Sequence, residues 1–200
     1  MRREAVQPAV TLSCTVPARA AHVRPPSTTL VGLRKDNRMA ALRSRRLESV
    51  FGAPVDVLTA AHIHALITAS VQEAFDLDFK ETLYGRGDSE KRALAGDVAA
   101  LANTAGGVIV LGIREDDHAC AEAAPGIELS DGEVGRIRQV VASLVAPMPV
   151  MDVFTVPDTS ASAATQAAGG AAPSRGFIII AVPRSPNAPH AVSAWLRGED

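Results

Sequence analysis

The stretch DVAALANTAGGVIVLGIRED, residues 97–116, decides the fold because a helical period gives way to a buried strand inside it. Apolar residues at helical spacing lead into it and predict an amphipathic helix over about residues 89–107. That stripe consists of Leu94, Val98, Leu101 and Ala102. The run 108–113 is wholly apolar and rich in β-branched residues, which is typical of a strand buried on both faces. Gly106 and Gly107 lie between the two, so we expect them to end the helix and pack against the strand.

Other elements on both sides of this unit complete a small fold. Residues 75–83 begin with strict alternation, which places Phe75, Leu77 and Phe79 on one face of a strand. A capping box at Ser130 and Glu133 opens a helix through Val145. Further helices are predicted at 40–50 and from Thr59, and further strands at 150–156 and 176–183. The order of elements predicts an α+β fold, a small mixed β-sheet with packed helices.

The two ends of the sequence differ in charge. Residues 1–46 hold ten Lys/Arg and two Asp/Glu, a balance of +8, whereas residues 47–200 have a balance of −10. The first 38 residues carry four prolines and no sustained period, so residues 1–45 are predicted to be a disordered basic extension. Residues 46–200 are predicted to form one domain, with a flexible Ala/Ser/Gly-rich loop at 157–175.

Several classes of protein are disfavoured by composition. No apolar run approaches 18 residues, so no membrane-spanning helix and no membrane partner are expected. The basic start lacks a continuous apolar segment, which argues against a secretory signal. Cys14 and Cys120 have no metal-ligand spacing and are expected to be reduced thiols. These features favour a cytoplasmic protein.

The polar face of the alternating strand is the first candidate site. Asp78 and Lys80 lie two residues apart and therefore share a face. Carboxylates at the ends of neighbouring strands can bind Mg²⁺ or Mn²⁺, and the ion would activate water and stabilise charge on a phosphate. Lys80 could stabilise the same charge. The alternative is a solvated strand face with an Asp–Lys pair, and Asp76 is expected to be only solvated.

A scattered set of basic side chains is the second candidate site, a nucleic-acid-binding surface. Lys91 and Arg92 lie at the start of a helix, where cations oppose the helix dipole, so phosphate binding there would explain them. The alternative is an ordinary helix start offset by Asp88 and Glu90. The proline-rich loop 184–192 could hold further phosphate contacts stiffly, or be only a rigid turn. The predicted contacts are Lys80, Arg86, Lys91, Arg92, Arg184, His190 and Arg197.

Three linked motifs resemble the Schlafen AlbA-type domain family. They are LDFKETLY, DVAALANTAGGVIVLGIRED and VPRSPNAPHAV, and the resemblance covers about residues 60–198. It implies binding to DNA or RNA, in bacteria often within a transcriptional regulator, and pairing as a homodimer. In some animal relatives the related core is an RNA endonuclease that uses three acidic residues.

Those acidic positions can be carried onto this sequence one by one. They fall on Glu73, on Asp78, and on Asp116 or Asp117, with Asp78 standing where the family has Glu. The resemblance thus implies Glu73, Asp78 and Asp116 as metal ligands and Lys80 as a catalytic neighbour. Three functions stay open: nucleic-acid binding, a metal-dependent ribonuclease with Mg²⁺ or Mn²⁺, and a scaffold without a nucleic-acid role, which the acidic folded part suggests.

Overall fold

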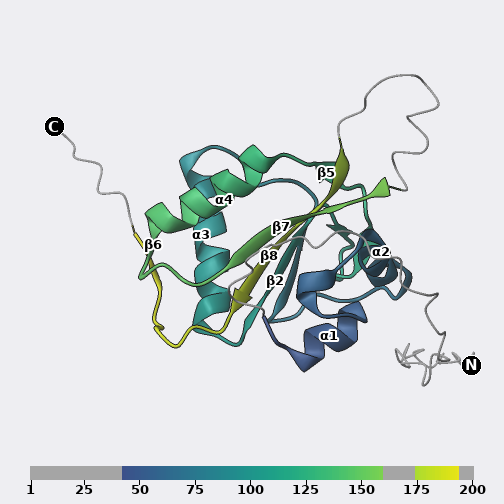
Figure 1. Ribbon diagram of the computed structural model, residues 1–200, viewed down its shortest axis with the longest axis horizontal. Helices are drawn as coiled ribbons and strands as arrows, with labels where there is room; N and C mark the ends of the chain where they lie inside the picture. The colour runs from purple at the N-terminus through teal and green to yellow at the C-terminus, as the bar shows by residue number, and fades with distance from the viewer. Residues whose placement is uncertain (1–41, 160–173, 194–200) are drawn as a thin grey trace, which may run out of the picture. The chain divides into compact units, whose positions relative to one another are not determined.

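The computed structural model describes residues 42–159 and 174–193 of the chain (Figure 1). The helices are α1 (Arg45–Phe51), α2 (Ala60–Thr68), α3 (Asp88–Asn103) and α4 (Asp131–Leu144), with a short 3-10 turn at Val55–Val57. Residues 1–41 of the predicted extension 1–45 and most of the predicted loop 157–175 lie outside the described residues. The last residues of the predicted extension are instead part of the fold, since Leu42 is buried and Ser44 caps α1. At the margins of the predicted loop, Pro157 ends one strand and Arg175 begins another. No helix in the described part is both long and apolar enough to cross a membrane.

A five-stranded mixed sheet forms the centre of the fold. Its strands are β1 (Leu77–Lys80), β2 (Gly106–Leu111), β5 (Ile127–Glu128), β7 (Asp152–Pro157) and β8 (Arg175–Pro183). β1 and β2 are parallel and joined through α3, whereas β8 runs antiparallel to β2, β5 and β7. Two small ribbons, β3 (Arg114–Glu115) with β4 (Ala121–Ala123) and β6 (Val145–Ala146) with β9 (Ala191–Val192), lie outside this sheet.

Helices cover both faces of the sheet (Figure 1). All six residues of β2 are buried, and their side chains alternate between two cores. Ile109 and Leu111 pack with α3 and α4, whereas Val108 and Val110 pack with α1 and α2. This arrangement confirms the predicted α+β fold with a small mixed sheet and packed helices.

The strand predicted at 75–83 is shorter than its alternation suggested. Ala74 and Leu77 exchange both backbone hydrogen bonds, so Phe75 and Asp76 form a two-residue turn and β1 begins at Leu77. Phe75 does not join Leu77 and Phe79 in the core, and it is 68% exposed. Asp76, expected to be solvated, is 4% exposed and pairs with Arg46.

Candidate acidic site and basic surfaces

Glu73 lies beside the outer edge of β1. The turn at Phe75–Asp76 folds the segment 72–74 back along the strand, and the Glu73 side chain accepts a hydrogen bond from the Phe79 N–H. The Glu73 N–H donates to the carbonyl of Ala119. An edge strand leaves backbone donors without a partner, and the Glu73 carboxylate satisfies one of them.

Asp78 and Lys80 face the α3 side of the sheet. In the parallel register with β2 they lie opposite Ile109 and Leu111, whose side chains point into the α3–α4 core. Lys80 Nζ donates to Asp78 Oδ1 at 2.6 Å. The second carboxylate oxygen, Asp78 Oδ2, is buried and has no hydrogen-bond partner among the described residues. The Asp–Lys pair expected from the spacing is therefore present, and one oxygen of the Asp78 carboxylate has no hydrogen-bond partner among the described residues.

The pKa values of Glu73, Asp78 and Lys80 reflect their partial burial and the closeness of several acids. Burial raises the pKa of Glu73, and the charges of Asp78 and Glu115 raise it further, against the hydrogen bond from Phe79. Burial likewise raises the pKa of Asp78, although its bond to Lys80 opposes the shift. Burial alone would lower the pKa of Lys80, but the bond and charge of Asp78 and the charge of Asp97 outweigh it and raise that pKa. Both carboxyls thus hold their protons more tightly than free ones do.

The third acid of the arrangement is Glu115, in β3. Its charge acts on both Glu73 and Asp78. Asp116 instead closes its own turn, accepting hydrogen bonds from the N–H groups of His118 at 2.8 Å and Cys120 at 2.9 Å. These two bonds lower the pKa of Asp116. Asp117 is exposed on the same turn.

The predicted metal trio of Glu73, Asp78 and Asp116 is not gathered around one point. Within residues 42–159 and 174–193, no three His, Cys, Asp or Glu side chains lie close enough together to hold a metal ion. Glu73, Asp78 and Asp116 each accept a hydrogen bond from a protein donor at one carboxylate oxygen. Metal binding at these residues stays a prediction.

Tyr84 and Asp97 join this site, and sequence reasoning missed both. The Tyr84 hydroxyl donates to Asp97 Oδ2 at 2.7 Å, linking the loop after β1 to the middle of α3. Burial, followed by the bond to Asp97, raises the pKa of Tyr84 well above its usual range. The charge of Asp97 also reaches Lys80. Tyr84 and Asp97 are thirteen residues apart, a spacing that leaves no periodic signal in the sequence. We call Glu73, Asp78, Asp97 and Glu115 the acidic group.

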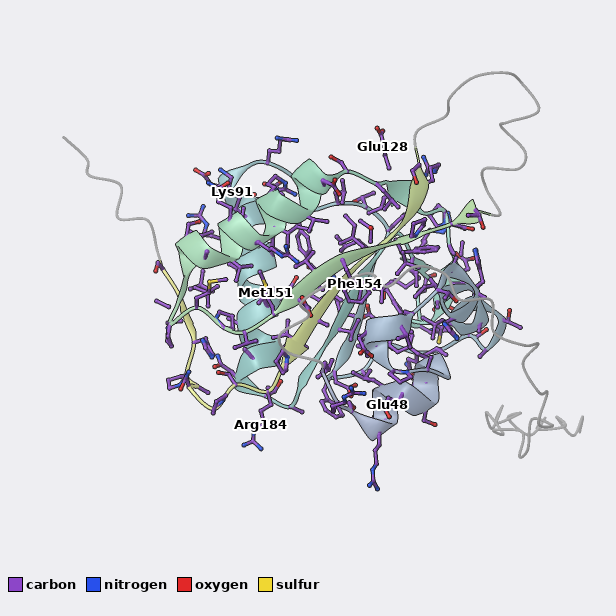
Figure 2. All side chains as sticks on the ribbon, viewed as in Figure 1. Glu48, Lys91, Glu128, Met151, Phe154 and Arg184 are labelled. Carbon is purple, nitrogen blue, oxygen red and sulfur yellow. The ribbon has the colours of Figure 1, made fainter. Side chains whose placement is uncertain are left out.

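Of the predicted basic residues, Lys91 and Arg184 lie at opposite ends of α3 (Figure 2). Arg86, Lys91 and Arg92 lie at or just before its first turns, where Lys91 pairs with Asp88 at 3.1 Å. Arg184 lies at the other end, because the adjacent Ser185 N–H donates to the carbonyl of Ala102. The sixteen residues of α3 separate these ends by roughly 24 Å. Arg197 lies outside the described residues.

His190 is placed inside the fold and does not face solvent. It is 5% exposed, and its ring Nδ1 bonds the carbonyl of Pro147. The side-chain amide of Asn103 clamps its backbone, accepting from His190 N–H at 2.7 Å and donating to its carbonyl at 2.9 Å. The predicted phosphate contact would need an exposed ring. Asn103 and His190 instead connect the C-terminal end of α3 to the loop before β9.

One of three comparisons with known proteins identifies a family. No curated protein matches the chain. The solved structure of the DIP2311 protein from Corynebacterium diphtheriae aligns with 72% of this chain at 19% identity and a TM-score of 0.38, and this chain spans 24% of that protein. The family model described as Schlafen, AlbA_2 matches residues 73–198. Because that match covers more than half of the sequence, the chain belongs to the Schlafen AlbA_2 family, which is broadly associated with nucleic acids.

Proposed function

We propose that this domain binds DNA or RNA through the sugar–phosphate backbone. The observation that carries the proposal is a set of exposed arginines whose side chains have neither an ion pair nor a hydrogen bond in the described part of the chain: Arg43, Arg45, Arg86, Arg92 and Arg184. Guanidinium groups that no carboxylate neutralises can contact phosphate and release its counterions. Family membership supports the same reading.

Arg86 and Arg92 form the better-organised half of this set. Arg86 lies in the loop between β1 and α3, whose carbonyls at Tyr84 and Gly85 accept hydrogen bonds from Arg136 of α4. A loop already held in place loses less entropy when it binds. Both arginines lie near the N-terminus of α3, where free N–H groups also favour an anion.

Lys80 is a weaker phosphate contact in this proposal. Its ammonium is already bonded to Asp78, and the charges of Asp97 and Glu73 also act on it. A phosphate approaching Lys80 would meet this negative charge, so we expect the backbone to follow Arg86 and Arg92 and to pass the acidic group at a distance.

Replacing Arg86 and Arg92 together by Ala is expected to weaken binding to every sequence about equally. Two lost phosphate contacts should make the slope of log K against log salt shallower by about 1.5 to 2. The measurement is fluorescence anisotropy with labelled RNA and DNA oligonucleotides between about 50 and 200 mM salt, where phosphate contacts weaken strongly. Arg114→Ala is the control for the loss of one arginine charge, at an arginine that Glu81 and Glu122 already pair.

The proposal fails if the parent protein binds neither nucleic acid, or if its affinity does not fall as salt rises. A scaffold without a nucleic-acid role would then be favoured. An unchanged slope in the double variant, with binding retained, would move the contact away from Arg86 and Arg92. The RNA and DNA arms of the measurement decide which nucleic acid is preferred.

A metal-dependent ribonuclease is a second candidate, favoured by the buried, unpartnered Asp78 Oδ2 and by the raised pKa values of Glu73 and Asp78. Crowded carboxylates that hold protons tightly would also favour a cation. Activity would require Glu115 or Asp116 to move toward Asp78. EDTA-sensitive cleavage of tRNA in Mn²⁺ that Asp78→Asn abolishes would support it; no cleavage by the parent would exclude it.

We further propose that the domain acts in the cytoplasm as part of a bacterial transcriptional regulator, and that it pairs as a homodimer. Light scattering of the purified chain tests the pairing directly. A monomer at concentrations well above those of the binding assays would contradict it.

A further inference from the structure

Phe75 is a large apolar side chain in an unusual place. It lies in the two-residue turn between Ala74 and β1 and is 68% exposed, the highest value among the exposed large apolar residues of the described chain. Tight turns favour Gly, Asn, Asp and Pro, because these residues suit the turn backbone. An exposed aromatic ring at such a position gains little from packing, so the fold alone does not account for it.

Arg46 holds a fixed position over this ring. Its guanidinium carbon lies 5.6 Å from the centroid of Phe75, within the range of a cation–π contact. The buried carboxylate of Asp76 pairs with Nη1 of the same guanidinium. Asp76 is fixed in turn, because its carbonyl packs so closely on Gly107 that a Cβ there would lie 2.6 Å from it. The ring, the guanidinium and the carboxylate form a preformed unit, which we call the Phe75 platform.

Exposed arginines lie near the Phe75 platform, in or just before the helix that carries Arg46 and at the same end of the sheet. Arg43 and Arg45 lie within three residues of Arg46 and are exposed. Arg184 lies at the same end of the sheet, since Gly106 packs on its backbone and Gly107 packs on that of Asp76. These backbones flank the start of β2 on its two sides, so they are roughly 10 Å apart, two strand spacings. The acids nearby in the chain are Glu48, Glu73, Asp76 and Asp78. Asp76 is paired with Arg46 and Asp78 with Lys80.

We propose that the Phe75 platform stacks an unpaired nucleobase of single-stranded nucleic acid, while the neighbouring arginines contact the flanking phosphates. Stacking on an exposed aromatic ring is how sequence-tolerant single-strand binders hold bases, and a planar guanidinium adds a second stacking surface. This inference rests on the proposed nucleic-acid function and deepens it. A base inside a duplex already stacks on its neighbours and has no free face for Phe75, so the platform selects single strands.

Phe75→Ala tests the platform with little risk to folding, because the side chain is exposed. We expect about a tenfold loss of affinity for a twelve-nucleotide single-stranded oligonucleotide, RNA or DNA. Affinity for a twelve-base-pair duplex should not change, and the salt slope should stay that of the parent because no phosphate contact is removed. Phe75→Tyr should bind as the parent does, and Val57→Ala, at another exposed apolar residue, should have no effect.

A spectroscopic variant reports the stacking itself. Trp195 is the only tryptophan of the chain, so Phe75→Trp combined with Trp195→Phe places a single indole at the platform. Addition of single-stranded oligonucleotide should quench its fluorescence, and Arg46→Lys, which keeps the charge for Asp76 but removes the planar group, should reduce the quenching.

The outcomes separate the two proposals. If Phe75→Ala binds single strands like the parent while Arg86→Ala/Arg92→Ala loses affinity, the platform is wrong and the nucleic-acid function stands. Equal losses for single strand and duplex would also overturn base stacking. If the parent protein binds no nucleic acid, both proposals fall together.

Discussion

Gly106→Ala is expected to lower the free energy of unfolding by about 3 kcal/mol, from left-handed backbone strain and overpacking together. Gly106 has φ +78°, a conformation that disfavours a Cβ. A Cβ there would lie 2.5 Å from the Arg184 nitrogen and 2.6 Å from the Val182 carbonyl oxygen. Both are backbone atoms at the end of β8, which pairs with β2 at Gly106, so they cannot withdraw without breaking the sheet.

Gly96→Ala is the matched control and should change stability in the opposite direction. Gly96 lies inside α3, and a Cβ added there meets nothing within 4 Å. Alanine is the better helix former, so a gain of about 0.5–1 kcal/mol is expected. Urea denaturation of the two variants beside the parent measures both effects. A Gly106→Ala midpoint at or above that of the parent would contradict the packing at the start of β2.

The unit of α3 and β2 was predictable because its determinants are local. A stripe at helical spacing, two glycines and an apolar run follow one another within residues 94–113, and each favours the same structure. Gly106 and Gly107 were expected to end the helix and pack against the strand, but they are the first two residues of β2 itself. Gly106 packs on the backbone at the end of β8 and Gly107 on Leu101 of α3. The helix itself ends slightly earlier, at Asn103.

The turn at Phe75–Asp76 could not be predicted because turn and strand look alike there. Apolar and polar residues alternate through residues 75–80, which is the period of a half-buried strand. The turn is instead set by pairing of Ala74 with Leu77 and by the bond between Asp76 and Arg46, thirty residues apart in the chain. Contacts at that separation leave no periodic trace in a single sequence.

The candidate site was predictable only in its first pair. Asp78 and Lys80 share a face because strand side chains alternate, and they are bonded as their spacing suggested. The choice among Glu115, Asp116 and Asp117 depends on one local bend, since Asp116 turns back onto the backbone of His118 and Cys120. The sequence holds three consecutive acids and gives no reason why Asp116, and not a neighbour, should bond the backbone of this turn.

Arg136→Ala is expected to destabilise the fold by about 3 kcal/mol and to weaken nucleic-acid binding as well. Glu133 is 7% exposed, and Arg136 Nε donates to its two carboxylate oxygens at 2.9 Å and 3.0 Å. The same guanidinium donates to the carbonyls of Tyr84 at 2.6 Å and Gly85 at 3.2 Å. Its removal leaves a buried carboxylate without its cation and two loop carbonyls without donors. Removing one partner of a buried ion pair destabilises a fold strongly, because the remaining charge stays buried without compensation.

A double variant separates the stability effect from the loop effect. Glu133→Gln with Arg136→Met removes both charges at once, so much of the lost stability should return, because replacing a buried pair by groups of similar volume is often close to neutral. The donors to Tyr84 and Gly85 stay absent in this variant. The loop should therefore remain loose, and Arg86 should lose its fixed position.

Hydrogen exchange and binding affinity then decide what Arg136 does for function. Amides of residues 84–87 should exchange faster in the double variant than in the parent, even where the two unfold at similar urea concentrations. Affinity should fall toward that of Arg86→Ala, because binding would then include the entropy cost of ordering the loop. Arg136→Lys keeps one cation for Glu133 but lacks the planar fork that reaches two carbonyls, so it should show an intermediate loss. Parent-like affinity in a stable double variant would mean that Arg86 needs no anchored loop, and the phosphate contact would then have to rest on the exposed helix start at Arg92.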